Sequence, residues 1–595
     1  MKAAAPICSP EDLSHWQPDP DIQLELIPLF NCDYFWDDIG QCRKATRSTS
    51  RILYCHDMAG NYLEADKNYG FTSVFPAFRF TRWHLIDIFV YFSHNLVTVP
   101  PLSWINLAHR QGVRVYGTVI FEKTDSFDFR SIFRDAEPKT LNHLEFAMHL
   151  NRVRRTLSFE GWLLNFEVNL PEPRTRNRVL EFIRELKRLG SEVIWYDSAA
   201  WSGLCAYQNS LTQENKPFFD AAQDGLFLNY NWNPMLLERS QRIAQNAETS
   251  SRVFVGVDCF GRGCPGGGGW NTNVALQLIL EAMLKRPQRP LSVALFAPGW
   301  PFENCDLTRA TGDRIAAHQL ISEADEKFWS LLEPWLTRIR GASQGCYALH
   351  RPTILSIPGG VLTSEDKASG VILKTNCCTG QGLLNGKQEY GSSMRCQNII
   401  PTGRNCSAQL GPIKEYETSL NRIRVTQYAC RDLKSGSGTC LWIRPTKPFS
   451  EKLHCELFSF APGLCNLTRM SAIQISVASF AHTNCDLTRI FTGYDDRHPS
   501  PISLFLDVGI LGDDGTGVLN QRLILSPSNV TTDSCNSRLW VLLEFTLASI
   551  SVAEKLDLHR FGIVWDYVAD KSAWSNEGFL VDYICLSDSA CPVFH

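Results

Sequence analysis

Two polar side chains interrupt an apolar run at 161–169, GWLLNFEVN. Asn165 and Glu167 lie two residues apart, and apolar residues flank each of them. Because successive side chains of a β-strand point to opposite faces, Leu163, Asn165, Glu167 and Asn169 share one face of this segment, with the amide and the acid about 7 Å apart. An unpartnered buried carboxyl is costly, so the pattern favours an acid that takes part in function over one that fills a core.

The surrounding elements predict where this pair lies. From 51 to 340, short β-branched or aromatic runs alternate with amphipathic stretches, which is typical of parallel strands joined by crossover helices. The expected strands are 52–58, 85–93, 113–121, 161–169, 192–198, 225–231, 253–260 and 292–299, and the clearest helices are 101–112, 141–157, 176–190, 233–247 and 274–286. Eight such repeats predict an α/β fold, a (β/α)8 barrel of the TIM type, whose catalytic residues lie at the C-terminal strand ends.

The two ends of the chain lack this alternation. The segment 1–50 is expected to pack on the barrel at 51–340, and 341–595 consists of short strands separated by Gly, Ser, Pro and Asn. We predict that this second half is an all-β, sandwich-like region, similar to carbohydrate-binding domains and with irregular insertions. Its clearest strands are 439–445, 472–480, 502–511, 521–527, 538–547, 561–569 and 578–587.

The bulk composition narrows the class of protein. The 595 residues carry a net charge of −4, 44% are hydrophobic and no long run of Lys or Arg occurs, so we expect a globular protein without a nucleic-acid partner. The first residues lack the apolar stretch of a secretory signal, and no stretch approaches about 18 apolar residues, so we predict a cytosolic protein with no membrane partner. The 21 cysteines are then expected to be reduced.

We predict neither a cofactor nor a metal. The glycine run from Gly266 to Gly269 is not followed by Gly-Lys-Ser/Thr, which argues against a phosphate loop. His56 and His94 lie near the ends of two expected strands, but no third ligand stands at a metal-binding spacing.

Several segments of the barrel half form an ordered set of motifs. They are CHDMAGNYL at 55–63, IDIFVYFSHNLVTVPPLSWINLAHRQGV at 86–113, GWLLNFEVNL at 161–170, WYDS at 195–198, DGLFLNYNW at 224–232, FGRG at 260–263 with the glycines up to 269, and APGW at 297–300. In this order they resemble glycoside hydrolase family 85, the cytosolic endo-β-N-acetylglucosaminidases. Several motifs in order are far more specific than any one of them.

The resemblance implies hydrolysis of the GlcNAc-β1,4-GlcNAc bond in the chitobiose core of N-glycans, with retention and without a cofactor. The 2-acetamido group of the substrate is the nucleophile in that family, so Glu167 would be the general acid and base, and Asn165 would hold the acetamido group as an oxazoline-like intermediate forms. Tyr196 would close the pocket around that group. The expected substrates are N-glycans, as free oligosaccharides or on misfolded glycoproteins. The residues expected to contact substrate are Glu122, Asn229, Asn231, Trp232, Asp258, Trp270 and Trp300.

The sequence departs from the family pattern beside the expected pocket. Val168 stands where the family usually has Asn, and 301–303 read Pro-Phe-Glu where it has Val-Tyr-Glu. An NCDLTR-like string follows, the first of three such strings, at 295–313, 458–470 and 479–496. Their irregular spacing excludes a solenoid.

Two alternatives to this function stay open. The departures would permit a glycan-binding, lectin-like protein that has lost activity, although a pure lectin has no need for the acid Glu167. A retaining glycosidase with two carboxylates would instead use Glu167 together with Asp258 or Glu122. That alternative predicts a loss of rate on removal of the second acid, with Asn165→Asp tolerated.

Overall fold

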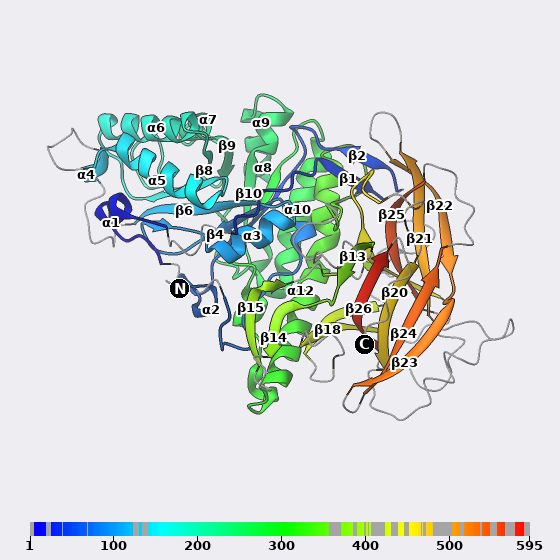
Figure 1. Cartoon of the computed structure of the whole chain (residues 1–595). Helices are drawn as coiled ribbons and strands as arrows, with labels where there is room; N and C mark the ends of the chain where they lie inside the picture. The colour runs from blue at the N-terminus through cyan, green and yellow to red at the C-terminus, as the bar shows by residue number, and fades with distance from the viewer. Residues whose placement is uncertain are drawn as a thin grey trace.

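The computed structural model describes most of the barrel half and the strands of the C-terminal half. The described residues are 5–18, 25–38, 40–67, 70–122, 130–133, 141–355, 370–384, 390–397, 400–402, 404–405, 423–429, 433, 438–445, 452–465, 467, 470, 472–479, 502–511, 517–535, 538–547, 556–565 and 578–587. Figure 1 shows the barrel beside a set of long antiparallel strands, with the helix α12 (Arg314–Ala342) among the elements where they meet.

Eight parallel strands close into a barrel within the described residues, which confirms the predicted fold class. In order they are β3 (Ile52–His56), β4 (Ile88–Tyr91), β6 (Arg114–Glu122), β7 (Gly161–Glu167), β8 (Glu192–Tyr196), β9 (Gln223–Phe227), β10 (Val253–Asp258) and β11 (Ser292–Phe296). The last strand pairs with the first, with Val293 opposite Ile52, and this pairing closes the barrel. A short strand, β5 (Val97–Thr98), pairs antiparallel with β6.

The expected helices are present on the outside of the barrel. They are α3 (Leu102–Arg110), α5 (His143–Leu157), α6 (Pro173–Arg188), α8 (Pro234–Ile243) and α10 (Thr272–Lys285). Helix α5 begins with a capping box, in which Asn142 and Glu145 satisfy each other's backbone N–H groups. The single helix expected at 233–247 is wrong, because α8 ends at Ile243 and Asn246 caps a separate short helix, α9 (Ala247–Ser251).

Nearly all the barrel strands end a few residues earlier than the sequence predicts. The strand expected at 225–231, for example, ends at Phe227, so Asn229 and Asn231 lie in a loop. Polar side chains just past the strand ends bond to neighbouring loops, as Asn169 does with the Cys205 N–H and Asp197 with the Asn209 N–H, although these residues continue the alternating pattern of the strand.

Alternation along β7 divides its side chains between two cores. Trp162, Leu164 and Phe166 pack in the large core between the strands and the outer helices. Leu163 packs inside the barrel, in a smaller core with residues such as Tyr116 and Phe254. This confirms the predicted faces of the strand and directs Asn165 and Glu167 toward the barrel axis.

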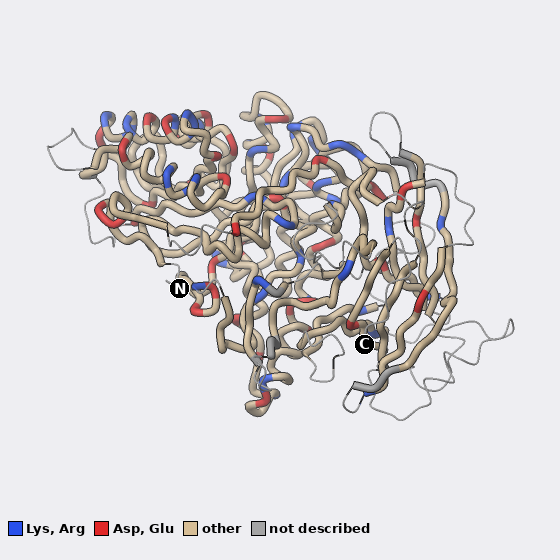
Figure 2. Tube along the Cα trace, viewed as in Figure 1, with Lys and Arg blue, Asp and Glu red and all other residues tan. Residues whose placement is uncertain are grey.

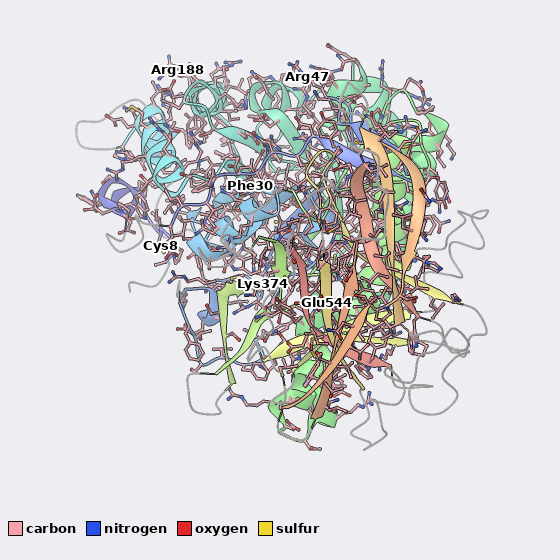
Figure 3. The ribbon with its side chains drawn as sticks, turned by 45° about the vertical axis from the view of Figure 1, so that its right-hand side comes forward. Cys8, Phe30, Arg47, Arg188, Lys374 and Glu544 are labelled. Carbon is pink, nitrogen blue, oxygen red and sulfur yellow. The ribbon has the colours of Figure 1, made fainter. Side chains whose placement is uncertain are left out.

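Two antiparallel sheets follow the barrel and share one apolar core, as predicted for a sandwich. One contains β13 (Val371–Thr375), β17 (Ile423–Ala429), β18 (Thr439–Pro445), β20 (Ala472–Ser479), β23 (Asn529–Cys535), β24 (Arg538–Thr546) and β26 (Phe579–Ser587), and the other β16 (Arg404–Asn405), β19 (Leu453–Ser459), β21 (Ile502–Leu511), β22 (Gly517–Leu525) and β25 (Leu556–Trp565). On β24, Glu544 lies between the core residues Leu543 and Phe545 and alternates to the other face (Figure 3). All seven expected strands overlap these elements, although 566–569 lie outside the described residues.

The N-terminal segment contacts both halves of the molecule. Ile7 pairs with Val97 on the barrel, whereas β1 (Tyr34–Asp37) pairs with β2 (Cys42–Lys44) and with β12 (Leu349–His350). The buried indole of Trp36 donates a hydrogen bond to the Phe460 carbonyl oxygen, 2.8 Å away, on the sandwich side. This segment therefore links the sandwich to the barrel that carries the expected site.

Charged residues of both signs are interspersed along the chain (Figure 2). Of the NCDLTR-like strings, the first ends in an exposed turn, where Asp306 caps the turn Leu307–Ala310. The second places Cys465, Leu467 and Met470 in the sandwich core. Almost all of the third lies outside the described residues.

Candidate active site

Asn165 and Glu167 meet at the mouth of the barrel, as the alternation predicts. The Asn165 amide Nδ2 donates a hydrogen bond to Glu167 Oε1 at 3.3 Å. Asn165 is buried, whereas Glu167 is the last residue of β7 and is partly exposed. The pair thus combines a fixed amide with an acid that solvent can reach.

A second carboxylate lies beside this pair. Glu122 ends β6 and is the register partner of Glu167 on the neighbouring parallel strand. His94, which follows β4, is hydrogen bonded through Nδ1 to Glu122 Oε1 at 2.9 Å. The bond to Glu122 raises the pKa of His94, and the carboxyls of Asp57 and Glu167 add to this shift. Glu122 therefore lies in the site, held by an imidazole to which the sequence pattern assigned no function.

Tyr196 ends β8 and lies inside the barrel mouth. Its hydroxyl donates a hydrogen bond to Asn229 Oδ1 at 2.9 Å. Burial raises the pKa of Tyr196 well above its ordinary value, and the charge of Glu167 adds to this. Trp195 points the opposite way and stacks on Phe218 in the outer core, with ring centroids 4.4 Å apart, as strand alternation requires.

Tyr207 is a site residue that sequence reasoning missed. It lies in the loop after β8, with its side chain beside the Glu167 carboxylate. Burial raises its pKa, and the charge of Glu167 raises it further. The only available signal was an aromatic residue in a loop at the C-terminal end of a barrel strand.

The two asparagines of the LNYNW motif differ in their surroundings. Asn229 accepts the Tyr196 hydroxyl and donates through Nδ2 to Asn209 Oδ1 at 2.9 Å. Asn231 is exposed at the rim, and its backbone N–H donates to the same Asn209 oxygen at 3.0 Å. Asn229 is therefore part of the wall of the site, and Asn231 faces solvent.

The structure corrects the expected position of Trp232. Its indole is 3% exposed, packs in the outer core, and donates a hydrogen bond from Nε1 to the Gly256 carbonyl oxygen at 2.7 Å. Because β9 ends at Phe227 and not at 231, the chain turns before Trp232 and carries this side chain into the wall behind the strands. No face of the ring is open to a sugar.

Asp258 also has a structural role in this region. It is fully buried and accepts hydrogen bonds from Arg262 Nε at 2.7 Å and Nη2 at 3.1 Å. The backbone N–H groups of Phe260 and Arg262 each donate to it at 3.0 Å. Four donors on two oxygens show that this carboxylate holds the loop after β10, which does not suit it as a second catalytic acid.

Trp270 and Trp300 form a pair on the loops after β10 and β11. Their ring centroids are 5.0 Å apart with an interplanar angle of 89°. Trp270 is partly exposed, and Lys327 Nζ lies 4.0 Å from its ring centroid. A Cβ added at Gly269 would lie 3.0 Å from the Trp300 ring, so glycine permits this close packing of the loop.

The departures from the family pattern also have definite positions. Val168 is buried in the outer core, so it faces away from the pair. Residues 301–303 lie in the short helix α11 (Trp300–Glu303), where Phe302 packs edge-on to Phe78 at 5.6 Å. Burial raises the pKa of Glu303, and the neighbouring Asp57 charge adds to this.

A barrel with an amide and an acid paired at the C-terminal end of a strand is typical of barrel enzymes. Residues 62–383, more than half of the chain, match the model of glycosyl hydrolase family 85, and the chain belongs to this family.

Named relatives agree with this assignment. The chain is 34% identical over 425 residues to the cytosolic endo-beta-N-acetylglucosaminidase of Gallus gallus, covering 66% of this chain and 52% of the relative. It is 38% identical over 289 residues to cytosolic endo-beta-N-acetylglucosaminidase 2 of Arabidopsis thaliana, covering 48% and 38%. The corresponding human enzyme is 35% identical over 340 residues, covering 56% and 41%. The match thus spans about half or less of each relative.

Proposed function

We propose that this chain is an endo-β-N-acetylglucosaminidase that hydrolyses the GlcNAc-β1,4-GlcNAc bond of the N-glycan chitobiose core. The observation that carries the proposal is the contact between Asn165 and Glu167 at the mouth of a family 85 barrel. An amide and an acid that touch each other can handle a sugar whose own acetamido group attacks the anomeric carbon.

In the proposed reaction, the acetamido oxygen of the substrate bonds to the anomeric carbon as the glycosidic C–O bond breaks. Glu167 gives its proton to the departing oxygen, and Asn165 holds and polarises the acetamido group. The intermediate is an oxazolinium ion whose nitrogen keeps its proton. Glu167 then takes a proton from the water that bonds to the anomeric carbon as the bond to the acetamido oxygen breaks, and it returns to its acid form. Two inversions at the anomeric carbon give overall retention.

The surrounding side chains supply binding in this proposal. Tyr196 and Asn229 form one wall of the acetamido pocket, and Tyr207, beside Glu167, orients the Glu167 carboxyl. The Glu122–His94 pair offers polar atoms for sugar hydroxyls. The Trp270–Trp300 pair is the candidate aromatic surface for a sugar ring.

We further propose that N-glycans reach the site as free oligosaccharides or on misfolded glycoproteins in the cytosol. The relatives are named cytosolic enzymes, which supports this location. Within the described residues, no helix combines the length and apolar character needed to cross a membrane. A glycan-binding role for the sandwich stays a prediction.

The test is release of a high-mannose glycan from a synthetic glycopeptide, followed by mass spectrometry. Cleavage that leaves one GlcNAc on the peptide supports the proposal. Binding of the glycopeptide without any cleavage would instead identify a lectin-like protein and refute the enzyme.

A two-carboxylate mechanism has one structural argument in its favour, the position of Glu122 beside Glu167. Replacing Glu122 with Gln separates the two mechanisms. If Glu122 were the nucleophile, hydrolysis would fall by several orders of magnitude and Asn165→Asp would keep most of the rate. The substrate-assisted reaction predicts that Glu122→Gln keeps more of the rate of hydrolysis than Asn165→Asp does.

A further inference from the structure

Asp197 is a buried carboxyl next to the site that the proposed reaction leaves unused. It follows Tyr196 directly, is 1% exposed, and lies on the face of the chain opposite the Tyr196 ring. Burial raises its pKa to about 7, while hydrogen bonds from its neighbours act in the opposite direction. A carboxyl so deeply buried needs compensating partners.

Its partners come from two different loops. In the loop after β8, the Asn209 backbone N–H donates to Asp197 Oδ2 at 2.7 Å, and Asn215 Nδ2 donates to Oδ1 at 2.8 Å. In the loop after β9, the Asn229 N–H donates to Oδ2 at 3.5 Å. One carboxyl therefore fastens both loops to the end of β8.

Asn209 extends this connection toward the site. Its Oδ1 accepts Asn229 Nδ2 at 2.9 Å and the Asn231 N–H at 3.0 Å. Its Nδ2 donates to the carbonyl oxygen of Tyr207 at 3.3 Å. Asn209 has a φ of +54°, a left-handed conformation that Asn tolerates better than most residues.

We infer that Asp197 is a positioning residue, which holds the loop after β8 so that Tyr207 stays beside the Glu167 carboxylate and Asn229 keeps its hydrogen bond with Tyr196. It touches neither the substrate nor the reacting atoms. The inference rests on the proposed function, because it explains how the acid is held for that reaction.

The chemistry of the contacts explains why an acid is needed. Each group that the structure places on the Asp197 oxygens is an N–H donor. An asparagine at this position would turn its own NH2 toward one of these donors, and that contact would be lost. Among the described residues that bond to this carboxyl, none carries a charge.

The first test is a double-mutant cycle between Asp197→Asn and Tyr207→Phe, read as kcat and KM on the glycopeptide. With Tyr207 present, Asp197→Asn should lower kcat roughly ten- to a hundredfold with a smaller change in KM, because the acid is misplaced. In the Tyr207→Phe background the same change should cost less than about threefold. Equal losses in both backgrounds would overturn the inference.

A matched control is Asp224 on β9, which contacts the opposite end of β8 from Asp197. Asp224 accepts the Val193 N–H at 2.6 Å and pairs with Lys187, far from the mouth. Asp224→Asn should lower the melting temperature but show no coupling to Tyr207→Phe. Coupling as large as that of Asp197 would mean that any damage to β8 has this effect, and it would refute a specific role.

Hydrogen–deuterium exchange separates this inference from the proposed function. In Asp197→Asn, the amides of 206–215 should exchange at least tenfold faster than in wild type, whether or not the protein cleaves glycans. Unchanged exchange in that loop would refute the inference, whereas a wild type without hydrolysis would refute only the proposed function. If Asp197→Asn fails to fold, Asn209→Gly keeps the positive φ, removes the link to Asn229 and Tyr207, and should show the same coupling to Tyr207→Phe.

Discussion

Replacing Asp258 with Asn tests whether this carboxyl anchors a loop or attacks the sugar. In the structure it accepts four hydrogen bonds and is fully buried, while its partner Arg262 has a side chain that is 61% exposed. The amide would turn an NH2 group toward two of the four donors. Losing two such bonds, with the ionic part reduced by solvent around Arg262, should lower the free energy of unfolding by about 2–4 kcal/mol.

The measurement combines thermal melting with hydrolysis of the glycopeptide. If Asp258 anchors the loop, Asp258→Asn should melt several degrees lower and keep kcat within about tenfold of wild type. Arg262→Gln removes the same ion pair from the other side and should behave alike. A variant Asp258→Asn with unchanged stability and a kcat reduced a thousandfold or more, beside a nearly normal Arg262→Gln, would show that the carboxyl is a nucleophile.

Three further predictions concern single side chains in and around the site. Trp232→Ala should cost about 3–5 kcal/mol of stability and leave KM nearly unchanged, because the indole is a core side chain; a large rise in KM in a stable protein would contradict this. Tyr207→Phe should lower kcat about three- to thirtyfold without a change in melting temperature, because its ring is 42% exposed, and an unaltered kcat would refute its contact with Glu167. Asp197 has a pKa raised from 3.8 to about 7, so it stabilises the folded state at low pH and that contribution is lost as the pH rises from about 4 through 7. The drop in unfolding free energy between pH 5 and pH 8 should therefore be larger in wild type than in Asp197→Asn, by up to about 3 kcal/mol, and equal drops would contradict the assignment.

Much of the barrel could be predicted because its strands have a regular period. Apolar and polar residues alternate along β7, so the faces of Trp162 and Asn165 followed from spacing alone. The same rule separated Tyr196 from Trp195. A residue at the end of a barrel strand is placed by the fold itself, and for this reason the Asn165–Glu167 pair was found.

The rest of the candidate site lies in loops, whose sequences have no regular alternation from which a position could be predicted. Tyr207 reaches Glu167 only because Asp197 and Asn209 hold the loop after β8 in place, and nothing in the local sequence reveals that path. The sequence predicts Trp232 at the mouth because the polar and apolar alternation of β9 continues past Phe227. The turn that buries this indole is stabilised by Gly256 on the neighbouring strand, a contact distant in sequence.

The pairing of His94 with Glu122 is another contact between separate strand ends. His94 follows β4 and Glu122 ends β6, and the two strands are neighbours in the barrel. The sequence pattern gives His94 no third ligand at a metal-binding spacing and assigns it no function. Its pairing with Glu122 depends on the neighbouring positions of β4 and β6, which the local sequence does not reveal.

The most direct test of the central claim is the behaviour of Asn165→Ala toward two substrates. We predict that this variant loses hydrolysis of the glycopeptide by at least a hundredfold but still consumes a preformed sugar oxazoline, because the step that needs the amide has already taken place. Glu167→Gln, measured in parallel, should consume neither. If Asn165→Ala hydrolysed the glycopeptide at the wild-type rate, the substrate would not be supplying its own nucleophile with the help of this amide, and the substrate-assisted mechanism would be wrong for this enzyme.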